Sequence, residues 1–161
     1  MRTPMFIFGV ALIATTAACG STSGPAHEGA PVTVGVGSVG DQGAVRIQVE
    51  ESSLGPILTD QNGRTLYAFL NDKGGASSCA DECTATWPAL ISRVPATTGT
   101  GASPELLSQT SRAEGTSQAT YGEWPLYYYV GDVGPGDVDG QGVDNVWFVV
   151  DADGQLVKTV P

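Results

Sequence analysis

Apolar and polar residues alternate strictly at one point of the chain, over residues 45–50. Val45, Ile47 and Val49 are apolar, and a polar residue follows each of them. This period of two is typical of a half-buried β-strand, because successive side chains of a strand point to opposite faces. We therefore expect the folded domain to begin with a strand over residues 45–50.

Two later segments predict hairpins, because each places a short glycine turn between two β-prone runs. Runs 56–59 and 64–70 flank Asn62-Gly63, and runs 146–150 and 155–160 flank Asp153-Gly154. A glycine turn of this kind between β-prone runs is a strong hairpin signal. The first hairpin and the end of the chain thus follow the same plan.

The segment between these hairpins also favours short strands. A loop rich in Thr and Gly spans residues 96–103, and a short helix is expected at 104–108. Strands are expected near residues 109–112 and 116–121. A further strand is expected over 126–130, opened by Pro125, since proline is tolerated at the first residue of a strand.

A short motif occurs twice, 60 residues apart. Leu66-Tyr67-Ala68-Phe69-Leu70-Asn71-Asp72 matches Leu126-Tyr127-Tyr128-Tyr129-Val130-Gly131-Asp132. Two copies are too few for an open solenoid. We therefore predict an all-β fold, mainly antiparallel with short hairpins. Two pseudo-symmetric repeats, at about 54–95 and 104–161, would share one barrel- or sandwich-like core.

The first residues predict an export signal. Arg2 precedes an apolar run over residues 5–14, which as a helix would be about 15 Å long, half of a hydrocarbon core of about 30 Å. A run of this length favours a signal peptide, here residues 1–18, over a membrane-spanning helix.

The junction Ala17-Ala18-Cys19 resembles a lipobox, the lipidation signal of bacterial lipoproteins. The resemblance implies that Cys19 carries a lipid that anchors the chain at the extracytoplasmic face of the cell membrane. An ordinary secretory signal cut near Cys19 is the alternative. Residues 19–43 are mostly Gly, Ser, Thr, Pro and Val, which predicts a flexible tether before a folded domain over 44–161.

The chain is strongly acidic, with seven basic and seventeen acidic residues. Such a domain is repelled by nucleic acid and by anionic lipid. We therefore expect no nucleic-acid partner, and we expect contact with the membrane through the lipid anchor alone.

Cys79 and Cys83 are the two cysteines of the predicted domain. An even number of cysteines outside the cytoplasm favours a disulfide. The short loop that it closes would contribute roughly 2 kcal/mol to stability, so the bond would be a local staple. A role in thiol exchange or metal binding is the alternative for this C-x-x-x-C pair.

Several of these segments together resemble a family of bacterial secreted-repeat lipoproteins with a Y-x-[F/W/Y]-x-x-D motif. Residues 67–72 and 127–132 both fit that motif, and the cysteine pair with Trp87-Pro88 fits a further family segment. Residues 136–142 and 147–150 resemble the family's tail. The resemblance covers residues 54–151, and it implies an exported repeat protein without implying a biochemical activity.

The repeated motif offers the first candidate site. On strands, Tyr67 and Phe69 would share one face, as would Tyr127 and Tyr129. Asp72 and Asp132 follow just after the strand ends. One interpretation is core aromatic residues with aspartates that bond turn amides. The other is a pair of equivalent binding sites at the mouth of the β-core.

A glycine-rich loop offers a second candidate site. It contains four aspartates, Asp132, Asp137, Asp139 and Asp144. Calcium takes several oxygen ligands from flexible loops of this type, although the spacing does not match an EF-hand. A calcium site and a solvated loop are the two interpretations.

Catalysis finds little support, because a Ser or Cys nucleophile usually needs a histidine base. The sole histidine, His27, lies in the predicted tether. We therefore expect a non-enzymatic binding or interaction module of the cell envelope without a cofactor, whose partner is an envelope protein or a small molecule. The alternative is an accessory in extracytoplasmic redox or metal handling that uses the cysteines or the aromatic–Asp motifs.

Overall fold

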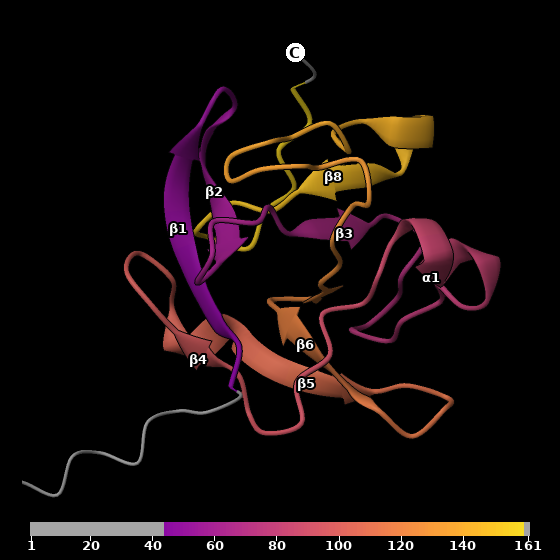
Figure 1. Cartoon of the computed structure of the whole chain (residues 1–161). Helices are drawn as coiled ribbons and strands as arrows, with labels where there is room; N and C mark the ends of the chain where they lie inside the picture. The colour runs from indigo at the N-terminus through magenta and orange to yellow at the C-terminus, as the bar shows by residue number, and fades with distance from the viewer. Residues whose placement is uncertain (1–43, 160–161) are drawn as a thin grey trace, which may run out of the picture. The chain divides into compact units, whose positions relative to one another are not determined.

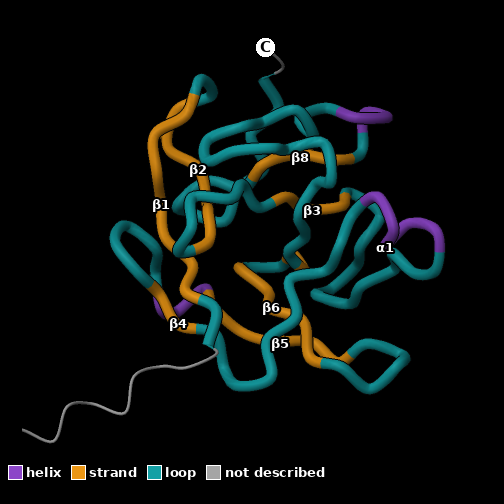
Figure 2. Tube along the Cα trace, viewed as in Figure 1, coloured by secondary structure: helices purple, strands orange, loops and turns teal. Residues whose placement is uncertain are grey.

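The computed structural model describes residues 44–159, which fold mainly into short strands joined by loops (Figure 2). The predicted signal peptide, Cys19 and the tether lie outside the described residues, as do residues 160 and 161. Across the part of the chain that is described, no helix is long and apolar enough to cross a membrane.

Within residues 44–159, eight strands form three small sheets. The strands are β1 (Arg46–Ser52), β2 (Gly55–Asp60), β3 (Tyr67–Phe69), β4 (Thr97–Thr98), β5 (Leu107–Ser111), β6 (Ser117–Tyr121), β7 (Trp124–Pro125) and β8 (Trp147–Val149). The sheet orders are β2-β1-β4, β3-β8 and β5-β6-β7, and all neighbours are antiparallel except β1 and β4. In Figure 1, β3 and β8 lie above β5 and β6, with β1 and β2 to one side. The all-β, mainly antiparallel prediction is confirmed.

Three short helical segments complete the described chain. The α-helix α1 (Glu82–Thr86) follows the first motif, and two 3₁₀ turns lie at Pro104–Leu106 and Val143–Asn145. The first 3₁₀ turn matches the short helix expected at 104–108. β1 confirms the strand expected at 45–50, and it continues to Ser52.

Both predicted glycine turns form, and each is fixed by an aspartate. One carboxylate oxygen of Asp60 accepts the amides of Asn62 (2.8 Å) and Arg64 (3.0 Å). In the same way, Asp151 accepts the amides of Asp153 (2.9 Å) and Gln155 (2.8 Å). The two turns are therefore built alike, as their sequences predict.

The hairpins predicted at these turns form only next to the turns and do not extend along the whole β-prone runs. Beyond the first turn a single bridge joins Thr59 to Thr65, and beyond the last turn a single bridge joins Val150 to Leu156. The chain then leaves its hairpin partner, because β3 pairs with β8 of the distant second half instead. Long-range pairing thus replaces the local hairpin that the turn predicts.

The strand predicted over residues 126–130 is also wrong. Tyr127 makes isolated bridges, to Tyr67 on one side and to Ala89 on the other. The amides and carbonyls of Tyr67 and Tyr127 bond each other at 2.8 Å and 2.9 Å. Because Tyr127 lies between two segments of the first half, the pairing stays local to this residue.

The two repeats share one core, as predicted. One buried cluster combines Leu58 and Leu90 of the first half with Ala119 and Leu126 of the second. A second cluster combines a tyrosine of each motif with two tryptophans, a cysteine and two aliphatic residues: Ile57, Tyr67, Cys79, Trp87, Tyr127, Trp147 and Val149. Each half therefore buries its apolar residues against the other half.

Backbone bonds between the halves repeat with the 60-residue spacing of the motif. Leu70 donates its amide to the carbonyl of Val146 (2.7 Å), and Val130 donates its amide to the carbonyl of Thr86 (3.1 Å). Leu70 and Val130 occupy equivalent positions of the two repeats, as do Thr86 and Val146, so each repeat donates one of the two bonds and accepts the other. The arrangement is a pseudo-two-fold pair of repeats, and it brings both motifs to one place.

Candidate functional site

The two aromatic–Asp motifs are joined by hydrogen bonds between their side chains. The hydroxyl group of Tyr67 donates to Asp132 at 3.0 Å, and that of Tyr127 donates to Asp72 at 2.8 Å. Each tyrosine therefore uses the aspartate of the other motif. This crossing follows from the pairing of Tyr67 with Tyr127, which sets the two motifs side by side in opposite directions.

Asp72 is almost fully buried, with 3% of its surface exposed. Besides the Tyr127 hydroxyl, its carboxylate accepts the backbone amide of Ser78 (2.6 Å) and the hydroxyl group of Ser78 (2.7 Å). These donors replace the water that a carboxylate loses on burial, as a buried charge requires. Asp72 is thus held by groups from both repeats.

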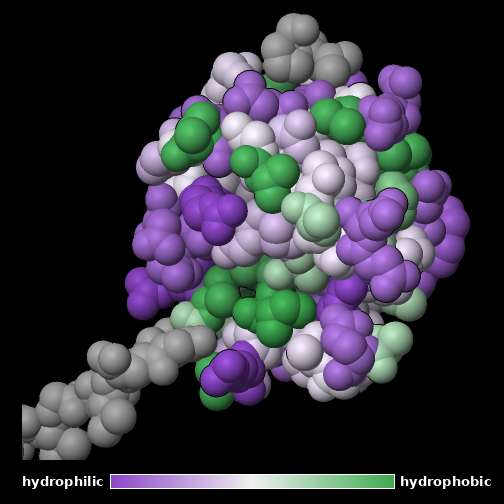
Figure 3. All heavy atoms as spheres, turned by 45° about the vertical axis from the view of Figure 1, so that its right-hand side comes forward, coloured by the Kyte–Doolittle hydropathy of each residue, from purple (hydrophilic) through white to green (hydrophobic). Residues whose placement is uncertain are grey.

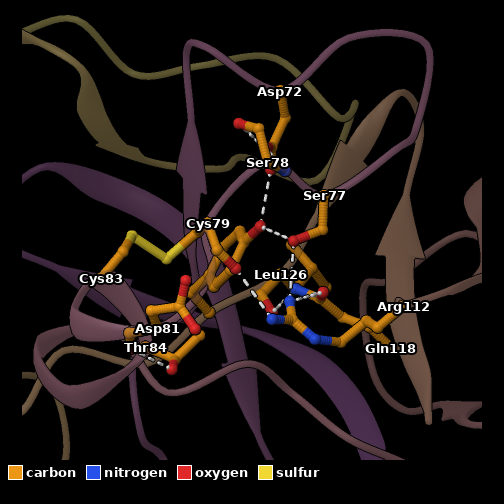
Figure 4. Close-up of a disulfide and its surroundings, with 11 residues drawn as sticks. Asp72, Ser77, Ser78, Cys79, Asp81, Cys83, Thr84, Arg112, Gln118 and Leu126 are labelled. Atoms are coloured by element: carbon orange, nitrogen blue, oxygen red, sulfur yellow. Dashed lines mark hydrogen bonds between the residues drawn. A yellow bond between two sulfur atoms is a disulfide. The ribbon is translucent and has the colours of Figure 1, made fainter. Parts of the chain in front are cut away.

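A chain of hydrogen bonds joins Asp72 to a buried arginine. The Ser77 and Tyr127 hydroxyl oxygens lie 2.7 Å apart, and Arg112 Nη1 donates to Ser77 at 2.7 Å. Since the one proton of the Tyr127 hydroxyl goes to Asp72, Ser77 is the donor to Tyr127. Figure 4 shows Ser77, Arg112 and Gln118 pointing toward one another beside the disulfide. The network thus connects a guanidinium with a carboxylate through two hydroxyl groups.

Asp132 is half-buried, and its surroundings differ from those of Asp72. Its second carboxylate oxygen accepts the amide of Asp139 at 3.1 Å. The amide of Gly140 donates to the Tyr67 hydroxyl oxygen at 3.2 Å. A Cβ atom at Gly140 would lie 2.9 Å from both the Trp87 and Tyr67 rings, so glycine is required for this close approach.

Burial sets the protonation of both tyrosines. Burial raises the pKa of Tyr67, and the negative charge of Asp132 raises it further. Burial likewise raises the pKa of Tyr127, and Asp72 adds to that effect. Burial also raises the pKa of Asp132 above the usual aspartate value. Both phenols are therefore protonated donors at neutral pH.

Four aromatic rings stack in a row between the motifs, in the order Phe69, Trp147, Trp87 and Tyr129. We call this set the aromatic column. Successive ring centroids lie 4.3, 3.9 and 4.5 Å apart, and the two indole planes differ by 4°. Trp87 and Trp147 are 60 residues apart, so the repeat spacing could have identified them as an equivalent pair.

The motif tyrosines flank the aromatic column edge-on. Tyr67 meets Trp87 at 5.4 Å and 74°, and Tyr127 meets Trp147 at 5.2 Å and 88°. Edge-to-face contact is a favoured aromatic arrangement. The six rings and the two carboxylates therefore form one connected unit at the interface of the repeats.

Cys79 and Cys83 form a disulfide, as predicted, with a Cα–Cα distance of 5.4 Å. Such distances are usual for disulfides. The bond closes the turn before α1. Within this turn, Asp81 has φ 50° and ψ −121°, a conformation that non-glycine residues rarely adopt. The disulfide thus holds a strained turn at the surface.

A groove of about 740 Å³ lies beside this turn. It is lined by residues of the disulfide turn and α1, of the segment after Trp87, and of the β5–β6 connection: Ala80, Asp81, Thr84, Pro88, Ala89, Ile91, Arg112, Ala113 and Glu114. Its volume lies in the range of about 300–1,000 Å³ that is usual for ligand sites. Sequence reasoning missed this groove, because its three segments are distant in the chain.

Arg112 forms a rigid part of the groove. Its side chain is 6% exposed, and it donates to Ser77, Gln118 (2.8 Å) and the Cys79 carbonyl (2.8 Å). It also pairs with Glu114, whose side chain is 53% exposed. These contacts fix the guanidinium at the point where the groove meets the Asp72 network.

The predicted motif sites are inside the protein. Tyr67 and Tyr127 are 0% exposed, and their hydroxyl groups are used by the two aspartates. Phe69 and Tyr129 are half-buried at the ends of the aromatic column. Binding of a ligand by the tyrosine hydroxyls stays a prediction, and this arrangement favours the core interpretation.

The glycine-rich loop uses two of its four aspartate carboxylates internally. Asp137 accepts the amides of Val133 (2.9 Å) and Gly134 (2.8 Å), while Asp132 accepts Tyr67 and Asp139. Asp139 and Asp144 are exposed. Over residues 44–159, no group of three or more His, Cys, Asp or Glu side chains is placed to hold a metal ion. Calcium binding here stays a prediction without a preformed set of ligands.

Comparison with known proteins gives one match. A family model described as a secreted repeat of unknown function matches residues 48–91 and again residues 108–151, together more than half of the chain. No curated protein and no solved structure matches the chain. The two matches begin 60 residues apart, and each includes one aromatic–Asp motif and one tryptophan of the aromatic column.

Proposed function

Because the chain belongs to the family of secreted repeats of unknown function, we propose that it is a lipid-anchored extracytoplasmic binding module that acts without catalysis. The signal-like residues 1–18 and the junction before Cys19 support the anchor. Cys79 and Cys83 support a location outside the cytoplasm, since disulfides persist in oxidising compartments.

The groove beside α1 is the proposed ligand surface. Its volume of about 740 Å³ is the observation that carries the proposal. The lining combines apolar Pro88, Ala89 and Ile91 with charged Asp81, Arg112 and Glu114. Ligand sites commonly have an apolar lining with a few fixed polar groups.

Two features hold the groove in shape before a ligand binds. The disulfide closes the turn that presents Asp81, and four hydrogen bonds hold the guanidinium of Arg112. A wall that is already rigid loses little conformational entropy on binding. Strained backbone such as that of Asp81 is common at functional sites, and it supports a functional role for this turn.

The chemistry of the groove favours binding over catalysis. Among its lining residues Thr84 is the one with a hydroxyl group, and that group donates to the Asp81 carbonyl at 2.7 Å. The sole histidine of the chain, His27, lies in the predicted tether. Covalent catalysis by a hydroxyl group needs an adjacent general base, and the Thr84 hydroxyl group bonds a backbone carbonyl instead of a basic side chain.

The surface around the groove is mixed in character. Figure 3 shows hydrophilic side chains over much of this side of the domain, with smaller hydrophobic areas between them. Ile91 is 38% exposed at the groove. A surface that mixes polar and apolar areas is usual for non-obligate interfaces. This composition fits a partner that binds reversibly.

Replacing Cys19 tests the anchor. The full chain and a Cys19→Ala variant would be expressed in a bacterial host and followed by membrane fractionation and intact mass. We expect the wild type to carry a lipid mass and to sediment with membranes, and the variant to be released. A variant that stays membrane-bound, with no lipid mass on the wild type, would contradict the anchor.

Crosslinking at the groove tests the binding role. A photoreactive phenylalanine analogue would replace exposed Ala113 in the anchored protein, and the matched control would carry it at exposed Asp153 in the last turn. We expect discrete adducts from Ala113 that purified domain competes away, and no such adducts from Asp153. Identical patterns from both positions, or none from Ala113, would contradict a role for the groove.

A further inference from the structure

We propose that the aromatic column and its two flanking tyrosines form a relay that accepts a one-electron oxidation at the surface and holds it as a neutral tyrosyl radical. The radical would rest on Tyr67 or Tyr127, beside Asp132 or Asp72. This activity is separate from binding in the groove, since it uses residues of the shared core.

The tryptophan pair is the first observation that supports the relay. Aromatic pairs prefer offset or edge-on contact, with centroids about 4.5–7 Å apart, over a face-to-face sandwich. The rings of Trp87 and Trp147 lie closer, at 3.9 Å, and their planes are nearly parallel at 4°. Two indoles in such close, parallel stacking share a positive charge, so the pair loses an electron more easily than one indole.

The tyrosine–aspartate pairs are the second observation. A phenol that loses an electron also loses its proton, so the oxidation needs a base at hydrogen-bond distance. Asp132 and Asp72 accept the protons of Tyr67 and Tyr127 at 3.0 Å and 2.8 Å. Each phenol also contacts a tryptophan of the column edge-on. In both repeats the phenol that gives up the electron thus contacts the carboxylate that takes its proton and the indole that takes its electron.

The electrons and protons balance as follows. A one-electron oxidant of the metal-complex class takes an electron from the indole pair, is itself reduced by one electron, and leaves the cation radical of the pair. The phenol of Tyr127 then gives an electron to the indole pair and its proton to Asp72, which yields a neutral tyrosyl radical and a carboxylic acid. A one-electron reductant reverses both transfers. Tyr67 and Asp132 make the same step in the other repeat.

The ends of the aromatic column connect the buried indole pair with the protein surface. Tyr129 and Phe69 are half-buried, while Trp87 and Trp147 are 4% and 3% exposed. Of the two end residues Tyr129 is the more easily oxidised, because its ring is a phenol. Its ring lies 4.5 Å from Trp87. An oxidant at the surface therefore exchanges electrons with the indole pair through Tyr129.

Two other tyrosines provide matched controls. Tyr121 is equally buried, but its hydroxyl group donates to the backbone carbonyl of Ala152 (2.8 Å), which is a poor base. Tyr128 donates to Asp60 at 3.0 Å, but its ring packs with the other core cluster, under the guanidinium of Arg64. Each control lacks one of the two features that the relay needs.

Flash oxidation of the purified, disulfide-bonded protein tests the relay. A photogenerated ruthenium(III) polypyridyl complex would serve as the one-electron oxidant, with transient absorption and electron paramagnetic resonance as readouts. In the wild type we expect a tryptophan radical that converts to a neutral tyrosyl radical. We expect the conversion to survive in Tyr121→Phe and Tyr128→Phe. When Tyr67→Phe and Tyr127→Phe are combined, we expect loss of the tyrosyl radical that is hydrogen-bonded to a carboxylate, which leaves at most a radical on the entry residue Tyr129.

A further variant decides the outcome if that double variant does not fold. Trp87→Phe leaves all tyrosine–aspartate bonds in place and removes one indole of the pair, and Trp124→Phe is its control outside the column. We expect loss of the tyrosyl signal in Trp87→Phe and an unchanged signal in Trp124→Phe. A signal that is unchanged in Trp87→Phe, or one lost instead in Tyr121→Phe or Tyr128→Phe, would overturn the relay.

Discussion

The hydroxyl group of Tyr127 donates a hydrogen bond to Asp72 of the other repeat at 2.8 Å. The equivalent bond in the opposite direction, from Tyr67 to Asp132, is 3.0 Å. The two bonds join equivalent residues of the repeats but differ in surroundings, because Asp72 is buried and Asp132 is half-buried. A pseudo-symmetric pair of motifs thus has one strongly enclosed and one more open carboxylate.

This difference predicts unequal effects of two equivalent substitutions. Asp72→Ala removes the acceptor of three donors, on Tyr127 and Ser78, and should cost about 3 kcal/mol, because buried donors are left without partners. Asp132→Ala should cost about 1 kcal/mol, since solvent replaces part of its contacts. Urea unfolding of both variants checks this. Equal losses, or a larger loss at Asp132, would contradict the difference.

The aromatic column predicts a large cost for removing either of its indoles. Trp147→Ala should lower the free energy of unfolding by about 3–5 kcal/mol, as is usual for buried large aromatic residues. Trp124 is half-buried outside the column, so Trp124→Ala is the matched control and should cost less. Thermal or urea unfolding measures both. A Trp147→Ala variant as stable as the control would contradict the packing.

Local chemistry made several features predictable from the sequence. Asn62-Gly63 and Asp153-Gly154 specify their turns, because an aspartate two or three positions earlier bonds the turn amides. The alternation over 45–50 specifies β1, and the spacing of Cys79 and Cys83 permits the disulfide. The 60-residue repeat predicts a shared core.

Long-range pairing was not predictable in the same way. The turn at Asn62-Gly63 predicts a local hairpin, but β3 pairs with β8 across about eighty residues of chain. The crossed bonds of Tyr67 and Tyr127 depend on that pairing, and the groove depends on the contact of Arg112 with the Cys79 carbonyl. Propensity and spacing along one chain carry no signal for such contacts.

Reduction of the disulfide should weaken the fold modestly. The loop between Cys79 and Cys83 is short, so loss of the bond should lower the free energy of unfolding by about 2 kcal/mol. Urea unfolding with and without reductant measures this, and a Cys79→Ala, Cys83→Ala double variant should show no effect of reductant. Two freely alkylated thiols in the unreduced wild type would contradict the disulfide.

High pH should unfold the protein through its buried phenols. Burial raises the pKa of Tyr67, Tyr127 and Tyr128 above the ordinary value of 10.0. Above that pH the unfolded chain loses these protons and the folded chain keeps them. Stability should therefore fall as pH rises, by up to about 1.4 kcal/mol per pH unit for each tyrosine.

Phenolate absorbance and urea unfolding, measured together across that pH, check this prediction. We expect the absorbance of these three tyrosines to appear with unfolding. Full ionisation of all five tyrosines of the chain in the folded state near pH 10.0 would contradict their burial.

A pair of double-mutant cycles tests the crossed arrangement of the motifs most directly. Tyr127→Phe and Asp72→Asn would be combined as the crossed pair, and Tyr67→Phe and Asp72→Asn as the pair within one motif. Residues in direct contact show interaction energies of about 0.5–3 kcal/mol, whereas independent sites are additive within about 0.5 kcal/mol. The crossed arrangement predicts about 1 kcal/mol or more of coupling between Tyr127 and Asp72, and additivity between Tyr67 and Asp72. Coupling within the motif and additivity across the repeats would contradict it.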